Sequence, residues 1–281
     1  MTQMKFGDFE IHLLNDGKFR LDGGAMFGIV PKVIWNKIHP ADEQNRIELG
    51  LNQVLIQTPE NKNILVNTGI GGKFNEKLRS IYAIDRSNTL LDSLKKFSLS
   101  ANDIHAVIAT HLHFDHNGGS TYYDSKGELQ LTFPEAEYIV QRLEWEDATH
   151  PHERNKASYL PENIEPLRRV KKLTLVDGDA EVFPGIEVRL TGGHTRGHQI
   201  VLIHSDDEIA VFWSDLIPTS GHTHVPFVMG YDLYPVDTIQ MKKRLLLEAV
   251  ERNWLCIWEH QTEQRMGRIR LGEKGYEVDM I

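Results

Sequence analysis

One hexapeptide constrains this chain more than any other feature of its sequence. Residues 111–116 read His-Leu-His-Phe-Asp-His, which places three imidazoles and one carboxylate within six residues. In a chain with fourteen histidines, this pattern is expected by chance about 0.002 times. Imidazole combined with carboxylate suits zinc, and also iron or manganese. The hexapeptide therefore predicts a metal centre, and the chain must fold so that further ligands reach it.

The sequence before the hexapeptide indicates how it would hold metal. Residues 106–109 form a short apolar run, which predicts a buried strand that ends just before His111. His111 and His113 are two residues apart, so their side chains project to the same side and can bind one cation. Asp115 and His116 lie beyond the turn and can point to a second cation. A structural zinc site commonly uses four ligands with thiolates among them, and the single cysteine of the chain cannot supply that set.

Three more candidate ligands lie in the second half of the chain. His194, Asp215 and His260 each come a few residues after an apolar, strand-like run. A carboxylate in the position of Asp215 is suited to bridge two cations. The two glycines at 192–193 are expected to let the backbone approach the metal closely.

The coarse pattern of the chain predicts an α/β fold. The predicted strands are 9–14, 53–57, 63–66, 106–109, 186–190, 199–204, 208–213 and 254–258, and the predicted helices are 88–97 and 237–252. The turn residues 60–63 predict a hairpin between the second and third of these strands. Each half reads as strands followed by a helix, which favours two sheets packed together with helices outside, in one domain.

Composition excludes several classes of partner. The chain has 31 basic and 40 acidic residues, and its net charge of -9 repels nucleic acid and anionic membrane surfaces. No apolar run exceeds five residues, so we expect no transmembrane helix. We expect a cytoplasmic protein, because the first residues show no secretory signal and a single cysteine fits a reducing compartment.

The motif and the order of the later residues resemble the metallo-beta-lactamase superfamily of dinuclear hydrolases. The resemblance extends from about Gln53 to His260 and implies a single domain over 1–281, folded as a four-layer αβ/βα sandwich with two mixed sheets. It implies two divalent metal ions, with zinc favoured and iron or manganese also suitable. The implied ligands are His111, His113 and His194 for the first ion, Asp115, His116 and His260 for the second, and Asp215 as the bridge.

The resemblance also implies a mechanism. A hydroxide that bridges the two ions attacks the carbonyl of the substrate, and Asp115 acts as the catalytic proton shuttle to the leaving group. One position departs from the family pattern: Asn67 stands where an Asp usually precedes Thr-Gly. A neutral amide there is expected to weaken the hydrogen bond to a ligand histidine, and with it the affinity for metal.

Within the superfamily, the chain most resembles the quorum-quenching N-acyl-homoserine lactone lactonases of the YtnP-like branch. The segments that carry this resemblance are 21–32, 110–116 and 191–194. It implies opening of a lactone ring and a homodimer. Residues 18–48 are then interpreted as a loop that forms a lid or a dimer contact. In that loop Met26 and Phe27 either line a pocket for the acyl chain or pack in the core.

The substrate pocket departs from the better-known lactonases. They place a tyrosine three residues after the bridging Asp, and here that position is Pro218. His222, His224 or Tyr231 would have to substitute. This leaves two alternatives to the lactonase reading: an aryl ester or organophosphate triester hydrolase of the same fold, and a non-catalytic lactone-binding protein. His198 is predicted to support a ligand and not to bind metal itself.

Overall fold

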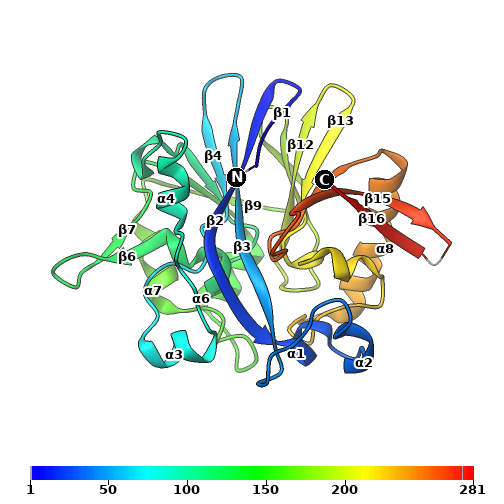
Figure 1. Cartoon of the computed structure of the whole chain (residues 1–281). Coiled ribbons are helices and arrows are strands. Elements are labelled where there is room, and N and C mark those ends of the chain that lie inside the picture. Colours follow the sequence, from blue (N-terminus) through cyan, green and yellow to red (C-terminus); the bar gives the residue numbers. More distant parts are fainter. Residues whose placement is uncertain (1, 274) are drawn as a thin grey trace. The chain divides into compact units, whose positions relative to one another are not determined.

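The computed structural model (Figure 1) describes residues 2–273 and 275–281. The chain divides into two compact units. The first unit comprises Met1–Gly17 and Leu51–Gly178, and the second comprises Lys18–Gly50 and Asp179–Ile281. The boundaries fall inside strands β2 (Phe9–Asp22) and β3 (Arg46–Gln57), so both strands contribute residues to each unit.

The first unit is built on a mixed seven-stranded sheet in the order β1-β2-β3-β4-β5-β8-β9. Its remaining strands are β1 (Thr2–Phe6), β4 (Asn63–Val66), β5 (Ala106–Ile108), β8 (Glu137–Gln141) and β9 (Lys172–Val176). The pairs β1-β2 and β3-β4 are antiparallel, whereas β4, β5, β8 and β9 run parallel. All side chains of β4 and β5 are buried, as expected for central strands of a mixed sheet.

Short helices and one hairpin complete the first unit. They are α3 (Glu76–Ile81), α4 (Leu90–Lys95), η1 (Ala101–Asp103), α5 (Phe114–Asn117), η2 (Gly118–Ser120), α6 (Arg142–Thr149), α7 (Pro161–Ile164), η3 (Glu165–Arg169) and the hairpin β6 (Thr121–Tyr123)–β7 (Leu129–Leu131). Helix α4 begins after Thr89, whose side chain accepts the N–H of Asp92. Its residues Leu90 and Leu94 then pack into one hydrophobic core with residues of β4, β5 and β8.

The second unit contains a seven-stranded sheet in the order β10-β11-β12-β13-β14-β15-β16. Its strands are β10 (Ala180–Phe183), β11 (Ile186–Leu190), β12 (Gln199–Ser205), β13 (Glu208–Phe212), β14 (Leu255–Ile257), β15 (Met266–Gly272) and β16 (Gly275–Met280). Neighbouring strands are antiparallel except β13 and β14, which are parallel. Parallel neighbours need a crossover, and helix α8 (Pro235–Glu251) lies between these two strands in the sequence. Two short turns, η4 (Ser214–Leu216) and η5 (Ser220–Thr223), follow β13.

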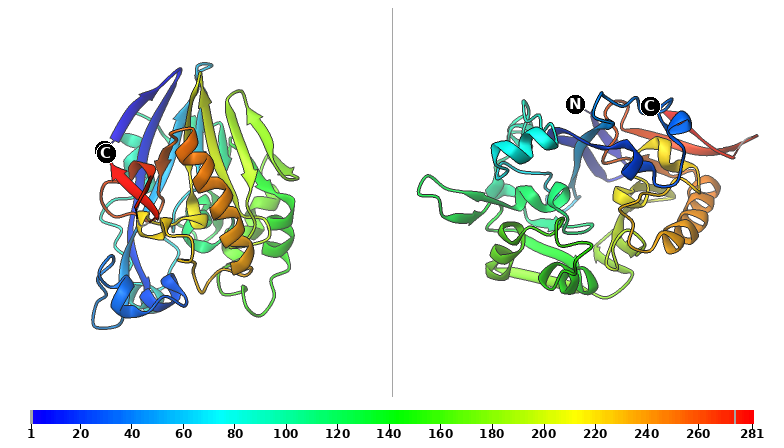
Figure 2. Two further views of the ribbon diagram at one scale, coloured as in Figure 1. Left: turned by 90° about the vertical axis from the view of Figure 1, so that its right-hand side faces the viewer. Right: turned by 90° about the horizontal axis from the view of Figure 1, so that it is seen from below.

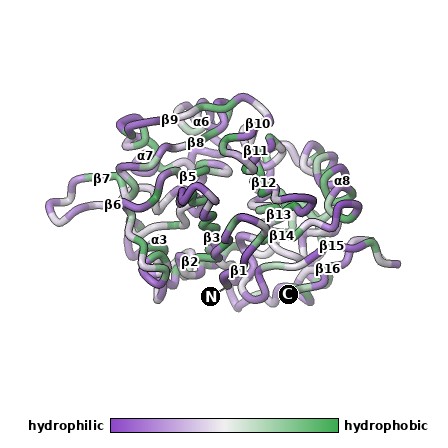
Figure 3. Tube along the Cα trace, turned by 90° about the horizontal axis from the view of Figure 1, so that it is seen from above, coloured by the Kyte–Doolittle hydropathy of each residue, from purple (hydrophilic) through white to green (hydrophobic). Residues whose placement is uncertain are grey.

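Helix α8 covers one face of this sheet (Figure 2, left). It begins with Pro235 in its first turn, a position where the missing N–H costs no hydrogen bond. It carries both hydrophobic and hydrophilic residues (Figure 3). Its apolar residues Leu245, Leu246 and Ala249 are buried in one core with residues of the sheet and with Trp213, which follows β13. Burial of each leucine contributes about 1.5–3 kcal/mol.

The segment predicted as a loop over 18–48 contains two short helices, so that part of the prediction is wrong. Helix α1 (Gly23–Phe27) begins where the side chain of Asp22 accepts the N–H of Ala25, and α2 (Lys32–Trp35) follows. The rings of Phe27 and Trp35 stack with centroids 5.7 Å apart and bury each other. Sequence patterning missed α1 because five residues with two glycines show no helical period. A role of the segment as lid or dimer contact stays a prediction.

The predicted fold class is confirmed: the protein is a mixed α/β chain with two large mixed sheets and helices. Strands β4 and β11 have the predicted bounds, and β3 and β4 form the predicted antiparallel hairpin. Strands β1, β8, β9, β10, β15 and β16 were not predicted. Among the described residues, no helix has the length and apolarity needed to cross a membrane.

Candidate metal centre

The hexapeptide forms a buried cluster in the first unit. Strand β5 ends at Ile108, His111 and His113 lie in the loop that follows, and Asp115 and His116 lie in α5. The His111 ring centroid is 4.6 Å from that of His113 and 3.9 Å from that of His116. The Nε2 atom of His116 is 3.6 Å from Oδ2 of Asp115. None of the four side chains is more than slightly exposed, so solvent does not satisfy them.

A buried carboxylate holds the loop that carries His111 and His113. Glu144 of α6 accepts the backbone N–H of Leu112 at 2.8 Å and the hydroxyl of Tyr159 at 2.8 Å. The Tyr159 ring lies 4.9 Å from the ring of His113. These contacts fix the backbone between the two histidines. Glu144 is far from the motif in sequence, and no pattern in the sequence pointed to it.

Asn67 connects β4 to two residues of the same cluster. Its Oδ1 accepts the N–H of Thr110 at 2.9 Å, and its Nδ2 lies 3.2 Å from Nδ1 of His116. The Thr110 hydroxyl in turn lies 3.2 Å from Nδ1 of His111. The backbone of Asn67 has a φ of 59°, a left-handed conformation that asparagine tolerates well. Asn67 therefore contacts a candidate ligand, as the sequence predicted.

The other three candidate ligands lie in the second unit, where His194 and His260 both face the carboxylate of Asp215. Oδ2 of Asp215 is 3.1 Å from Nε2 of His194, and Oδ1 of Asp215 is 3.1 Å from Nε2 of His260. Asp215 lies in η4, directly after β13, and His260 follows β14, which is paired parallel with β13. The carboxyl ends of two adjacent parallel strands thus bring these residues together.

The other nitrogen of each of these histidines faces an acceptor. Nδ1 of His194 is 2.9 Å from Oδ1 of the buried Asp232, and Nδ1 of His260 is 2.8 Å from the carbonyl oxygen of Gly50. A carboxylate and a carbonyl only accept, so both rings carry hydrogen on Nδ1 and present a lone pair at Nε2. Two lone pairs then face the two oxygens of Asp215, an arrangement that a cation between them stabilises. This donor set fits divalent metal ions.

Both ring nitrogens of His198 contact protein atoms. Its Nε2 accepts the backbone N–H of Asp215 at 3.1 Å, and its Nδ1 lies 2.6 Å from the hydroxyl of Thr191. It holds Asp215 through the backbone N–H of that residue. The expectation that the glycines before His194 let the backbone approach the metal stays a prediction, and at Gly193 the structure gives a separate reason for glycine, because a Cβ there would meet Oγ1 of Thr238 at 2.4 Å. This glycine permits close packing against α8.

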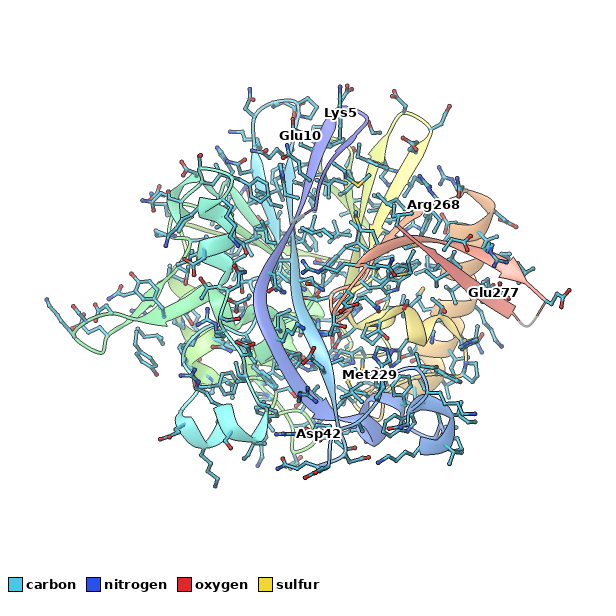
Figure 4. All side chains as sticks on the ribbon, viewed as in Figure 1. Lys5, Glu10, Asp42, Met229, Arg268 and Glu277 are labelled. Carbon is cyan, nitrogen blue, oxygen red and sulfur yellow. The ribbon has the colours of Figure 1, made fainter. Side chains whose placement is uncertain are left out.

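The residues predicted to contact substrate fall into two groups. Met26, Phe27 and His222 are buried inside the second unit, and His222 stacks on Phe27 with centroids 4.3 Å apart. His224 and Tyr231 are exposed. Gly28 and Gly230 allow the α1 segment to run against the segment that contains Met229 (Figure 4), since a Cβ on Gly28 would lie 2.6 Å from the carbonyl oxygen of Val228.

Both nitrogens of His222 are engaged by protein atoms. Nε2 lies 2.9 Å from the carbonyl oxygen of Met26, and Nδ1 lies 2.8 Å from Oγ1 of Thr219, which is also 3.0 Å from Nε2 of His39. Burial lowers the pKa of His222 to about 3 and that of His39 to about 4. His222 therefore anchors α1, and in this geometry it offers no nitrogen to a substrate, contrary to its predicted role.

A buried lysine holds the neighbouring segment. Lys242 of α8 is inaccessible to solvent, and its Nζ donates to the carbonyl oxygens of His224 at 2.9 Å and Phe227 at 2.7 Å. Burial lowers its pKa to about 7. The segment fixed in this way continues to Asp232, the partner of His194.

An aromatic cluster adjoins Asp115 in the first unit and was not predicted. Phe114 lies 5.4 Å from Phe74 and 5.3 Å from Tyr82, measured between ring centroids, and Phe74 and Tyr82 are 6.0 Å apart. Burial and then the negative charge of Asp115 raise the pKa of Tyr82, so its hydroxyl keeps its proton at neutral pH. The three aromatic residues are spread over 74–114 and share no sequence period that would have revealed them.

Comparisons with known proteins agree with this geometry. The family model described as metallo-beta-lactamase superfamily matches residues 47–260. An N-acyl homoserine lactonase from a Bacillus species is 30% identical over 226 residues, which cover 76% of this chain and 82% of that protein. A solved structure of a probable metal-dependent hydrolase from Staphylococcus aureus is 34% identical, with a TM-score of 0.90, and 98% of this chain and 97% of that one are covered. The dizinc quorum-quenching lactonase AidC shares the fold, with a TM-score of 0.81 at 24% identity, and 100% of this chain and 97% of that one are covered.

Proposed function

The chain belongs to the metallo-beta-lactamase superfamily and is a metal-dependent hydrolase, and from this premise we propose that it opens the lactone ring of N-acyl-homoserine lactones. Support comes from the relatives named N-acyl homoserine lactonases, which match about three quarters of the chain. The aromatic cluster described above supplies the second line of support, because an acyl chain needs an apolar surface beside the reacting group.

We assign seven residues to two divalent ions, with zinc favoured. His111, His113 and His194 would hold the first ion, Asp115, His116 and His260 would hold the second, and Asp215 would bind both. The hydrogen-bonding of His194 and His260 supports this assignment, because both rings present Nε2 to the oxygens of Asp215. When bound, two such ions lower the pKa of a shared water and polarise a carbonyl.

Asp115 and Tyr82 then have separate roles in ring opening. Asp115 takes the proton of the attacking water and delivers it to the ring oxygen that leaves as an alcohol. We assign the hydrogen bond to the substrate to Tyr82, because its ring packs on Phe114, the neighbour of Asp115 in the sequence, and its hydroxyl keeps its proton. It fills the role that Pro218 cannot, since proline has no side-chain donor.

The structural observation that carries the choice of an acylated substrate is the packing of Phe74, Tyr82 and Phe114 next to Asp115. Three aromatic rings at centroid distances of 5.3–6.0 Å form an apolar wall, and each ring buries substantial area when a ligand covers it. A small polar ester would gain little from this wall. We therefore expect turnover to rise with acyl-chain length up to a medium chain.

The test is hydrolysis of N-octanoyl-homoserine lactone by zinc-loaded protein, followed with a pH indicator. The wild type is expected to turn over, and Asp115→Asn is expected to lose about 100-fold or more in kcat. Tyr82→Phe keeps the ring but removes the hydroxyl, so it should lower kcat/KM about 10-fold without changing the zinc content. Phe74→Ala should raise KM for the octanoyl substrate more than for an acetyl analogue.

The same preparation separates the lactonase from its closest alternative. Initial rates are compared for the lactone, p-nitrophenyl acetate and paraoxon. A higher kcat/KM for paraoxon or the aryl ester than for the lactone would contradict the lactone proposal and assign the protein to ester or phosphotriester hydrolysis. Tight binding of lactone without turnover by zinc-loaded protein would contradict both.

A further inference from the structure

We propose that Asn67 makes the metal site at Asp115 and His116 the weaker of the two, because its amide holds His116 in the tautomer with hydrogen on Nε2. The inference deepens the proposed function and rests on it in one respect, namely that Asp115 and His116 ligate a divalent ion.

The histidines differ in what faces their Nδ1 atoms. His194 and His260 face pure acceptors, Oδ1 of Asp232 and the Gly50 carbonyl, which place hydrogen on Nδ1 and leave Nε2 for a metal. His116 instead faces Nδ2 of Asn67 at 3.2 Å. An amide NH2 only donates, so Nδ1 of His116 accepts and hydrogen resides on Nε2.

A 180° rotation of the Asn67 side-chain amide would turn its oxygen toward Nδ1 of His116, but contacts with Thr110 oppose this rotation. Oδ1 of Asn67 accepts the backbone N–H of Thr110 at 2.9 Å and also lies 3.1 Å from the Thr110 hydroxyl. A flipped amide would direct its NH2 at the Thr110 N–H, so two donors would face each other in a site with no exposure to solvent. The backbone of Thr110 therefore fixes the orientation of the Asn67 side chain.

The tautomer bears directly on the metal site. Nε2 of His116 is the atom near Asp115, with 3.6 Å between Nε2 and Oδ2, and a ligand atom of each residue lies within 4.8 Å of one on the other. A metal ion there needs the lone pair that hydrogen occupies. Binding must then move that hydrogen to Nδ1 and break the contact with Asn67. His194, which the assignment gives to the other ion, requires no such change.

Asn67→Asp removes the conflict with almost no change in size. One carboxylate oxygen keeps the Thr110 N–H, and the other accepts hydrogen from Nδ1 of His116. Aspartate also tolerates the φ of 59° at this position. Loss or gain of such a supporting partner changes metal affinity by about 10–100-fold.

The experiment measures zinc binding by calorimetry on chelator-treated full-length protein. We expect the wild type to bind two zinc ions whose dissociation constants differ by at least about 10-fold, and Asn67→Asp to tighten the weaker one by about 10–100-fold. The tautomers are read independently from two-bond 15N–1H correlation spectra of the metal-free imidazoles. The His116 ring should carry hydrogen on Nε2 in the wild type and on Nδ1 in Asn67→Asp, whereas His222 should carry hydrogen on Nε2 in both proteins.

Asn117→Asp is the control for added charge. Asn117 is buried next to His116, but its Nδ2 donates to the carbonyl of Asn163 and its Oδ1 accepts from Ser120, so it does not face the His116 ring. Equal tightening in both variants would overturn the inference, because charge alone would then explain it. Two wild-type sites within threefold of each other, or an unchanged tautomer in Asn67→Asp, would also overturn it.

The outcomes separate this inference from the proposed function. Protein that shows unequal zinc sites, corrected by Asn67→Asp, but hydrolyses no lactone supports the inference and contradicts the proposed substrate. Protein that hydrolyses lactone with two equal zinc sites supports the function and overturns the inference. Wild-type protein that binds no zinc contradicts both.

Discussion

Acidification should destabilise the second unit through His222, and the hydrogen bonds there give the reason. The Met26 carbonyl only accepts, so Nε2 of His222 carries the hydrogen and Nδ1 accepts from the Thr219 hydroxyl. The same hydroxyl can then accept from Nε2 of His39. A proton added at Nδ1 of His222 would place two donors against each other and charge a ring stacked on Phe27.

The sign and size of the effect follow from the pKa. In the unfolded chain His222 titrates near 6.5, whereas burial lowers its folded pKa to about 3. Between these values the unfolded state binds more protons, so the free energy of unfolding falls as the pH falls. The free energy of unfolding should be about 2 kcal/mol lower at pH 5 than at pH 7.5 because of His222 alone. His39, whose pKa is also lowered by burial, acts in the same direction.

The assay is urea unfolding of metal-free protein at several pH values between 7.5 and 5, followed by tryptophan fluorescence. Four of the five tryptophans, at positions 35, 213, 254 and 258, belong to the second unit, so the signal reports mainly on it. His222→Gln is the perturbation, since its amide can donate to the Met26 carbonyl but does not titrate. His150→Gln, at an exposed site, is the control.

The predicted result is a difference in how steeply the free energy of unfolding falls as the pH is lowered. Stability of wild type and His150→Gln should fall in parallel, and His222→Gln should lose about 2 kcal/mol less between pH 7.5 and 5. Other histidines titrate equally in all three proteins and cancel in the comparison. Parallel lines for wild type and His222→Gln, within about 0.5 kcal/mol, would refute the assignment of a neutral, buried His222.

Three shorter predictions test the packing. Gly28→Ala should lower the free energy of unfolding by about 2–3 kcal/mol, because it adds a Cβ 2.6 Å from the Val228 carbonyl oxygen at a φ of 56°. Gly127→Ala is the control: its φ is also positive, but a Cβ there has no atom within 4 Å, so it should lower the free energy of unfolding by only about 1 kcal/mol. Urea unfolding measures both. Glu144→Ala should lower stability by about 3 kcal/mol and reduce the zinc retained after gel filtration, and full zinc retention would argue against its role in holding the histidine loop. Cys256 is fully buried and its thiol pKa is raised to about 12 by burial, so a thiol reagent should label it only after urea is added.

The parts of the fold that were predictable have local causes. Strands β4 and β11 are apolar runs, and the turn residues next to them in the sequence mark where each strand ends. The candidate ligands of the hexapeptide were equally visible, because 111–116 packs four of them into one short stretch. Strands β15 and β16 were missed because polar residues such as Arg270 and Glu277, which pair across the hairpin, mask the alternation (Figure 4 labels Glu277).

The supporting residues could not be predicted, because long-range contacts place them. Asp232 follows His194 by 38 residues, and Glu144 follows Leu112 by 32, with no spacing rule to connect them. The reading of residues around Phe27 as a loop failed for a related reason. Its helix is stabilised by tertiary contacts with Trp35 and the later part of the chain, which override weak local propensity.

The discontinuity of the second unit has a consequence for biosynthesis. Met26, Phe27 and Trp35 leave the ribosome long before His222, because 187 residues separate Trp35 from it. At about 5–20 residues per second, these apolar side chains wait about 10–40 s for the partner that buries them. During that interval the nascent chain exposes an apolar segment, which favours binding by a holdase chaperone. Slowed translation over 51–178 should therefore lower the yield of native protein more than slowed translation after 222.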